Sequence, residues 1–474
     1  MHAANPLPWE PTQAPEDDAR ESLAVVIPAL NERANLELLL PALRMALVRL
    51  AVRCEIVVVD GGSRDDTAEV AGAHGARVVR QRERGYGGAL LAGFGATSAS
   101  WVLTMDADLS HGCEFLGELW QRRGEGDIVI ASRYVAGGDA VVGWIRGLLS
   151  RALNRAFAWA LALPIRDLSS GFRLYKRSVV ESARFAARDF DALEEIVIRA
   201  HNAGHRVVEV PFRYMPRRNG TSHVRFVRFA FAFATTLVRM WRLRNSAAAA
   251  DYDWRAFDSR IWLQRAWQRS RHRTVLGLLE GRGSILDVGC GSSHIIVDLP
   301  DAVGLDLAHA KLRWLRPRHG PLVQATAECL PFGDASFATV ICSELVEHLP
   351  DGGAVWSELE RVLAPGGLLI VGTPDYRRPL WRVIEWVYGR ILPDAYAGEH
   401  ITRYTRTRLA ATLAELGLEA EEYRYVFSCE MIVRARKGAA AVPRPDTDRR
   451  PATACSDRDD RSPRGRHGRA ATGS

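Results

Sequence analysis

A short apolar run that ends in two acids, at residues 101–109 (Trp-Val-Leu-Thr-Met-Asp-Ala-Asp-Leu), constrains the fold of this chain most strongly. Such a run, bounded by turn-forming residues, is typical of a buried parallel strand, so Asp106 and Asp108 are expected where that strand leaves the sheet. Ligands bind at such strand ends. Two carboxylates one residue apart can hold a divalent cation that bridges the phosphates of a nucleotide. A solvated Asp-Ala-Asp turn explains the same residues, and this run alone leaves both interpretations open.

Two upstream stretches repeat the pattern of an apolar run followed by polar side chains. The run that begins at Val25 ends at Asn31 and Glu32, and the run 56–59 ends at Asp60. Further apolar runs alternate with helical patterns along the first 131 residues. Alternation of this kind predicts an α/β fold with a parallel sheet.

In this order, the three motifs resemble the family 2 glycosyltransferases of GT-A fold, most closely the dolichol-phosphate or polyprenyl-phosphate sugar synthases. The resemblance covers residues 22–243. It implies a GT-A nucleotide-sugar-binding domain that transfers a hexose, with inversion, from a GDP- or UDP-hexose to polyprenyl phosphate. It also implies Mg²⁺ or Mn²⁺ held by Asp106 and Asp108. Asp60 and Arg133 complete the expected catalytic group of this domain.

The resemblance further implies which residues surround the nucleotide sugar. They are Pro28, Ala29, Leu30, Glu32, Val58, Asp60, Asp106, Ala107, Asp108, Arg133, Arg217 and His223. The chain departs from the family pattern at three of its positions. Leu30 stands where a Tyr is frequent, Gly61 stands where a second Asp is common, and His223 replaces a Lys. Because a histidine is only partly charged near pH 7, His223 should hold a phosphate less firmly than a lysine does.

Three elements between residues 84 and 173 extend the pattern. A glycine-rich turn at 84–89 opens a helix, where glycine lets the backbone approach a ligand closely. Arg133 follows a strand and is expected to meet the nucleotide phosphates, because a guanidinium pairs two oxygens at once. Asp167 and Arg173 are candidate acceptor-side groups, with a structural salt bridge between them as the alternative.

Two segments, 144–163 and 224–244, interleave aromatic and aliphatic residues with arginine at helical spacing. Such helices can lie in a membrane interface, although packing against the sheet explains them as well. A lipid-phosphate acceptor favours peripheral membrane contact. No segment has the roughly 20 uninterrupted apolar residues that a membrane span needs.

A second strand-and-glycine pattern begins at residue 284, Ser-Ile-Leu-Asp-Val-Gly-Cys-Gly-Ser, and a strand that ends at Asp306 follows. The spacing matches a Rossmann-like fold in which the acid binds a ribose. With later Leu-Pro-Phe and Ala-Pro-Gly-Gly elements, residues 254–436 resemble class I S-adenosylmethionine-dependent methyltransferases rather than dinucleotide-binding dehydrogenases. The resemblance implies S-adenosyl-L-methionine as cofactor, bound by Asp287, Gly289, Gly291, Asp306, Glu328 and Ser343.

Catalysis in the second domain needs a base if the acceptor is a hydroxyl, and His348 and His400 are the candidates. Glu344, Glu347 and His348 have the spacing of one helical face. Such a face can hold a divalent metal or can simply be solvated.

The expected organisation is a disordered lead-in over 1–20, a glycosyltransferase domain over 21–245, a methyltransferase domain over 246–437 and a disordered tail over 438–474. With 474 residues, 47% of them hydrophobic, the chain can bury two cores. Seven cysteines without a Cys-x-x-Cys pair indicate a reducing cytoplasm. We therefore expect a cytoplasmic protein that contacts the inner face of the cell membrane and does not bind nucleic acid. A transferase with a soluble acceptor and a non-catalytic nucleotide-sugar-binding module remain the alternatives.

Overall fold

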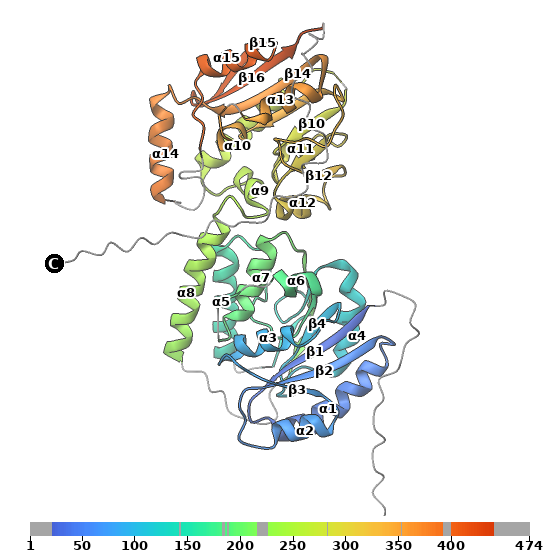
Figure 1. Cartoon of the computed structure of the whole chain (residues 1–474). Helices are drawn as coiled ribbons and strands as arrows, with labels where there is room; N and C mark the ends of the chain where they lie inside the picture. Colours follow the sequence, from blue (N-terminus) through green and yellow to red (C-terminus); the bar gives the residue numbers. More distant parts are fainter. Residues whose placement is uncertain are drawn as a thin grey trace, which may run out of the picture.

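The computed structural model describes residues 21–141, 144–182, 185–186, 189–215, 226–281, 283–351, 353–391 and 400–439. Arg217, His223, the lead-in 1–20 and all but the first two residues of the tail lie outside this part of the chain. Figure 1 shows two lobes, each built around one sheet and joined where α8 (Phe226–Arg244) leads into α9 (Tyr252–Phe257).

The first lobe contains a seven-stranded sheet in the order β3-β2-β1-β4-β7-β5-β8. Neighbouring strands are parallel except for β7, which is antiparallel to both β4 and β5. The strands are β1 (Ser22–Ala29), β2 (Arg53–Asp60), β3 (Arg77–Arg80), β4 (Trp101–Thr104), β5 (Ile128–Ser132), β7 (Arg173–Lys176) and β8 (Val207–Pro211). A two-stranded sheet pairs β6 (Asp139–Ala140) with β9 (Arg213–Tyr214). The predicted α/β fold is confirmed, and β7 adds an antiparallel strand to it.

Helices cover both faces of this sheet because successive side chains of each strand point to opposite faces. Val25 belongs to the core that α1 and α4 cover, whereas Val26 belongs to the core beneath α3, α5, α7 and α8. The helices are α1 (Arg33–Val48), α2 (Thr67–Ala73), α3 (Tyr86–Gly95), α4 (Leu116–Gln121), α5 (Trp144–Ala160), α6 (Arg177–Ser182) and α7 (Ala192–Asn202), with 3-10 turns at Cys113–Phe115 and Arg122–Glu125.

The inner sides of the two amphipathic segments pack in the core, as the packing interpretation predicts. Phe157 of α5 packs edge-to-face on Phe233 of α8, with ring centroids 5.8 Å apart, and both rings lie in the core. The outer sides of the same helices expose large apolar side chains, among them Trp144, which is 79% exposed. Within the described residues, no helix combines the length and apolarity that crossing a bilayer requires.

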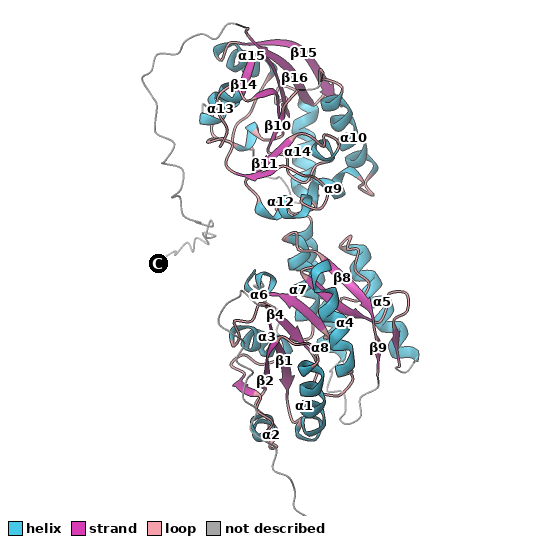
Figure 2. Ribbon diagram, turned by 90° about the vertical axis from the view of Figure 1, so that its right-hand side faces the viewer, coloured by secondary structure: helices cyan, strands magenta, loops and turns pink. Residues whose placement is uncertain are grey.

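The second lobe contains a seven-stranded sheet in the order β12-β11-β10-β13-β14-β16-β15, in which only β16 runs against its neighbours. Its strands are β10 (Ile285–Val288), β11 (Val303–Asp306), β12 (Leu322–Gln324), β13 (Phe337–Ser343), β14 (Leu363–Pro374), β15 (Leu418–Val426) and β16 (Glu430–Lys437). Its helices are α10 (Trp262–Leu276), α11 (His294–Val297), α12 (His309–Leu315), α13 (Ala354–Val362), α14 (Pro379–Ile391) and α15 (Arg406–Glu415). Figure 2 shows α9 and α12 at the end of this lobe that faces the first.

The junction between the lobes is packed rather than extended. Arg244, the last residue of α8, donates two hydrogen bonds to the Asp251 carboxylate at 2.6 and 2.8 Å. The amide of Ala250 donates to the carbonyl of Asn202 at 2.9 Å, and Arg313 donates to the carbonyl of Ala203 at 3.2 Å. These contacts tie the junction and α12 of the second lobe to the C-terminal end of α7 in the first lobe.

Candidate active sites

The acids predicted from the apolar runs lie at the ends of adjacent strands of the first sheet. Ala29 of β1 pairs with Asp60 of β2, and Asp106 and Asp108 follow β4, which pairs with the other edge of β1. Asp60 accepts a hydrogen bond from the amide of Ser63 at 3.0 Å, which closes the turn after β2. The parallel order of β2, β1 and β4 therefore brings the three acids to one edge of the sheet.

Hydrogen bonds with Ser110 and His111 order the turn after β4. Asp108 is buried and accepts hydrogen bonds from the amide and the hydroxyl of Ser110. Leu109 between them adopts a left-handed conformation, with φ of 63°. The amide of Asp106 donates to His111 Nδ1 at 3.0 Å, and the His111 ring stacks on Phe172 at 4.9 Å. The turn is therefore an ordered structure and not a loose solvated loop.

Tyr86, which the sequence analysis did not select, contributes to the same site. Its hydroxyl donates to Asp106 Oδ1 at 3.1 Å, and its ring stacks on Phe190 at 4.8 Å. Burial, together with the charge of Asp106, holds the pKa of Tyr86 well above its ordinary value, so the hydroxyl stays a donor. The glycine-rich turn was the available signal: a Cβ on Gly88 would lie 2.1 Å from the carbonyl oxygen of Glu83. Glycine at position 88 therefore lets the start of α3 lie against the backbone at Glu83, and Tyr86 of α3 contacts Asp106.

Of the residues expected around the nucleotide, Pro28, Ala29, Leu30, Glu32, Val58 and Asp60 lie at or just beyond the ends of β1 and β2. Leu30 is exposed, and Asn31 accepts a hydrogen bond from the amide of Arg64 at 2.8 Å. The amide of Glu32 donates to the hydroxyl of Thr67 at 2.9 Å. The side chains of Val58 and Ala107 are buried, so they support the site from beneath, as does the chain at Pro28 and Ala29.

Arg133 and Asp167 form a bidentate ion pair. The guanidinium donates from Nε to Oδ2 at 2.8 Å and from Nη2 to Oδ1 at 2.7 Å. Burial alone would raise the pKa of Asp167, but the hydrogen bonds and charge of Arg133 outweigh it and hold that pKa below its ordinary value. Arg173 is fully buried and donates to the carbonyls of Leu193 and Leu168. The partner of Asp167 is therefore Arg133, and the alternative Asp167–Arg173 salt bridge is not formed.

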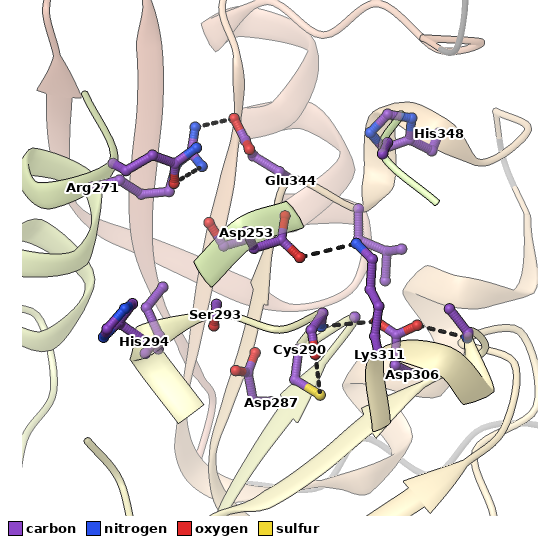
Figure 3. Close-up of a pocket in the computed structure, with 18 of the residues that line it drawn as sticks. Asp253, Arg271, Asp287, Cys290, Ser293, His294, Asp306, Lys311, Glu344 and His348 are labelled. Atoms are coloured by element: carbon purple, nitrogen blue, oxygen red, sulfur yellow. Dashed lines mark hydrogen bonds and ion pairs between the residues drawn. The ribbon is translucent and has the colours of Figure 1, made fainter. Parts of the chain in front are cut away.

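The second lobe contains a cavity of about 650 Å³ at the ends of β10, β11 and β13. Figure 3 shows Asp287 at its base, with Asp306 and Lys311 on one side and Glu344 across from them. Asp306 accepts hydrogen bonds from the amides of Gly291 at 2.8 Å and Ala308 at 2.7 Å. Gly289 and Gly291 have φ of 74° and 56°, which is why glycine occupies both positions.

Among the acids that line this cavity, Asp287 has the fewest hydrogen-bond partners. It is 3% exposed, and its Oδ2 has no hydrogen-bond partner among the described residues. Burial, reinforced by the charge of Asp306, raises the pKa of Asp287 to about 7. A cationic ligand would supply the missing partner.

Two further residues that line the cavity, Asp253 and Lys311, were not identified from the sequence. Asp253 of α9 accepts hydrogen bonds from the amide of Ser292 at 3.0 Å and from Lys311 Nζ at 2.9 Å. No local pattern marks either residue, because their pairing joins segments 58 residues apart. Ser343, which was predicted to bind the cofactor, lines the cavity, whereas Glu328 is exposed on the loop after β12 and is not among the residues that line it.

The predicted helical face of Glu344, Glu347 and His348 is wrong. Glu344 lies beyond β13 in a left-handed conformation, with φ of 55°, and only Val346–His348 form a short 3-10 turn. Glu344 accepts a hydrogen bond from Arg271, a residue that also pairs with Glu430. His348 lines the cavity and approaches His400, with ring centroids 4.9 Å apart. Burial, followed by the charges of His348 and Arg403, lowers the pKa of His400 to about 4, so its ring is neutral at pH 7.

Comparison with known proteins assigns a transferase family to each lobe. Residues 24–184 match the model of glycosyl transferase family 2, and residues 286–371 match that of a methyltransferase domain. The dolichol-phosphate mannosyltransferase of Pyrococcus furiosus is 37% identical over 215 residues, which are 43% of this chain and 59% of that protein. The polyprenol monophosphomannose synthase of Mycolicibacterium smegmatis is 37% identical over 213 residues, 42% of this chain and 79% of that protein.

The chain therefore belongs to glycosyl transferase family 2 and carries a methyltransferase domain after it. It spans less than two thirds of the length of the Pyrococcus protein. Among solved structures, glucosyl-3-phosphoglycerate synthase from Mycobacterium tuberculosis is 23% identical, covering 48% of this chain and 80% of that chain with a TM-score of 0.38.

Proposed function

We propose that this chain is a bifunctional enzyme. Residues 21–245 transfer a hexose, with inversion, from a GDP- or UDP-hexose to polyprenyl phosphate, and residues 246–437 transfer a methyl group from S-adenosyl-L-methionine. The observation that carries the first activity is the convergence of Asp60, Asp106 and Asp108 at adjacent strand ends. The names of the two curated relatives support a lipid-phosphate acceptor.

The chemistry of this transfer suits the residues present. A phosphate acceptor is already anionic, so it attacks the anomeric carbon without a general base. Mg²⁺ or Mn²⁺, held by Asp106 and Asp108, would neutralise the charge that develops on the leaving diphosphate. Carboxylate oxygens are the ligands that such hard cations prefer, and the Asp106 side chain is partly exposed, which leaves it accessible to an ion. Tyr86 and Ser110 would hold the two carboxylates in place.

The first activity is tested with the full chain, polyprenyl phosphate and Mn²⁺, using a panel of labelled GDP- and UDP-hexoses. We expect label in the organic phase with at least one donor. If no donor in the panel gives a lipid-linked sugar, the lipid acceptor is ruled out.

The second activity rests on the cavity at the ends of β10, β11 and β13. S-adenosyl-L-methionine carries a sulfonium and an ammonium group, and Asp287 offers a buried carboxylate oxygen without a described partner. Asp306 stands where a ribose-binding acid is expected, and Gly289 and Gly291 allow a ligand to approach the backbone closely. When bound, the cofactor supplies an electrophilic methyl group. Calorimetric titration of the full chain should give one binding site, and the absence of binding would rule out the methyltransferase activity.

The proposed location is the cytoplasm, with peripheral contact to the inner face of the membrane. The outer sides of α5 and α8 support this location because their exposed apolar residues lie among arginines. An enzyme with a lipid-phosphate acceptor must reach a substrate whose phosphate lies at the membrane surface.

A further inference from the structure

Three potential ligand side chains gather beside the cavity of the second lobe. Glu347, His348 and His400 each offer one ligand atom, and these atoms all lie within 4.8 Å of one another. The first two belong to one 3-10 turn, and the third precedes α15. The amides of Ile401 and Thr402 both donate to the carbonyl of Glu347, at 2.8 and 3.0 Å. The backbone itself therefore clamps His400 against that turn.

Glu347 is the observation that points to a ligand. Its side chain is 1% exposed, and the Thr373 hydroxyl is a neighbouring donor, but no hydrogen bond of ordinary geometry reaches either carboxylate oxygen from the described residues. A buried carboxylate in that state is costly, and buried charges in proteins are paired or coordinate metals. A lysine or arginine usually pairs with such an acid. Arg271 instead forms ion pairs with Glu344 and Glu430.

A hydrogen-bonded chain orients His400 in the way that metal-binding histidines require. Tyr376 donates its only hydroxyl proton to Glu385 at 2.8 Å, so its oxygen accepts from His400 Nδ1, 2.7 Å away. The proton on Nδ1 leaves the lone pair on Nε2. Histidine ligands are commonly held by such a partner on the other ring nitrogen, which fixes the tautomer.

We propose that Glu347, His348 and His400 bind one divalent first-row transition-metal ion, such as Zn²⁺ or Co²⁺, beside the methyl-donor cavity. Two imidazoles and one carboxylate suit such an ion, and three protein ligands leave a coordination position open. Glu344 is not a ligand, because it is turned toward Arg271, away from His348 (Figure 3).

The open position defines the class of methyl acceptor; this step alone rests on the proposed methyltransferase activity. A hydroxyl group on the ion loses its proton to solvent more readily, because the ion stabilises the oxyanion. The oxygen then forms a bond to the methyl carbon while the bond from that carbon to sulfur breaks, and S-adenosylhomocysteine leaves. The acceptor is therefore a hydroxyl compound, and the product is a methyl ether.

The test measures metal stoichiometry and does not depend on turnover. The full chain, without a polyhistidine tag, is stripped with chelator and titrated with Co²⁺, and bound metal is measured together with the visible absorption of cobalt. We expect His400→Gln and Glu347→Gln each to lose about one equivalent and the absorption band of a site with nitrogen ligands. His309→Gln, which removes a histidine outside the cavity, is the matched control and should keep both.

Asp108→Ala separates this site from the predicted cation site of the first domain. It should lower Co²⁺ binding while the nitrogen-ligand band persists. If Glu347→Gln does not fold, His400→Gln decides, since His400 is less buried than Glu347. The proposal is overturned if the wild-type chain shows no such band, or if His400→Gln keeps the full stoichiometry. Calorimetry with S-adenosyl-L-methionine, run in parallel, shows separately whether the cofactor proposal stands.

Discussion

At the scale of single residues, the buried acids fall into two groups that differ in whether their carboxylates have partners. Asp108 is buried but hydrogen-bonded to Ser110, and Asp167 is neutralised by Arg133. Asp287 and Glu347 are equally buried, yet each has carboxylate oxygen without a described partner. Because unpaired buried polar groups lower stability, we infer that a bound ligand supplies the missing partner of each of these two carboxylates.

The first prediction concerns Asp108. Asp108→Ala removes one of two carboxylates proposed to hold the cation, so hexose transfer should fall by about 10²-fold or more, as when a group that stabilises developing charge is lost. Initial rates at saturating donor measure the effect. Asp139→Ala, at an exposed strand position, is the control and should retain the wild-type rate. A similar loss in both variants would contradict the metal role.

The second prediction concerns the pH dependence of cofactor binding. With a pKa of about 7, Asp287 is largely protonated below that pH in the ligand-free protein. A cationic ligand must displace this proton, so the affinity for S-adenosyl-L-methionine should weaken as pH falls from 8 to 6, by up to about tenfold per unit. Calorimetry across this range measures it. Asp287→Asn should flatten the dependence, and an unchanged slope in that variant would contradict the assignment.

The same raised pKa also affects the stability of the ligand-free protein. An unfolded Asp287 ionises near its ordinary pKa of about 4, whereas the folded residue keeps its proton to about pH 7. The folded state therefore binds more protons over that window, and the contribution of Asp287 to stability declines as pH rises from about 4 to about 7.

At the scale of elements, α5 and α8 each have two different faces. The inner faces fill the core through Phe157, Phe233 and Met240, whereas the outer face of α5 exposes Trp144, Leu148 and Leu149. A helix whose only role was packing would not need those exposed residues.

The third prediction tests that outer face. Replacing Trp144, Leu148 and Leu149 together with serine should abolish co-sedimentation with anionic vesicles, because the apolar area available for insertion is lost. The matched control replaces three exposed apolar residues of α1, Leu38, Met45 and Val48, with serine. It should bind vesicles like the wild-type chain. Equal binding by both variants would place the membrane contact elsewhere.

Some elements could be predicted from sequence and others could not, for identifiable physical reasons. The apolar runs that end at Asp60 and Asp106 are local patterns, and the parallel sheet follows from them. The antiparallel β7 was not predicted, because strand direction depends on long-range pairing that four residues do not encode. Asp253 and Lys311 were missed because their pairing is also long-range, whereas the glycine-rich turn beside Tyr86 was a local signal that was not followed to that residue. The spacing of Glu344, Glu347 and His348 predicted one face of a helix. That prediction was wrong because Glu344, just after β13, has a left-handed backbone conformation and only one 3-10 turn follows it.

At the scale of the whole molecule, a buried ion pair holds the two lobes together. The side chains of Arg244 and Asp251 are almost fully buried, and Ala249 and Ala250 beside them are completely so. Ala247 and Ala248 of the same junction line the cavity of the second lobe. The proposed boundary at 245–246 therefore lies in packed structure, which fixes the two sites within one particle.

The fourth prediction follows from that ion pair. Asp251→Asn leaves the buried Arg244 without a counter-charge on its own segment, and we expect it to lower stability by about 3 kcal/mol. Asp258→Asn makes the same change in an exposed pair with Arg269 and should cost less than about 1 kcal/mol. Urea denaturation at pH 7 compares them. Equal midpoints for the two variants would show that the junction does not depend on this pair.

The central claim is that the first domain uses a lipid phosphate as acceptor, and a direct competition between acceptors tests it best. The full chain is given one labelled nucleotide sugar, vesicles containing polyprenyl phosphate, and a water-soluble phosphorylated acceptor at equal concentration. The account predicts label in the lipid fraction, dependent on polyprenyl phosphate and abolished by Asp108→Ala. Label confined to the water-soluble product would contradict it.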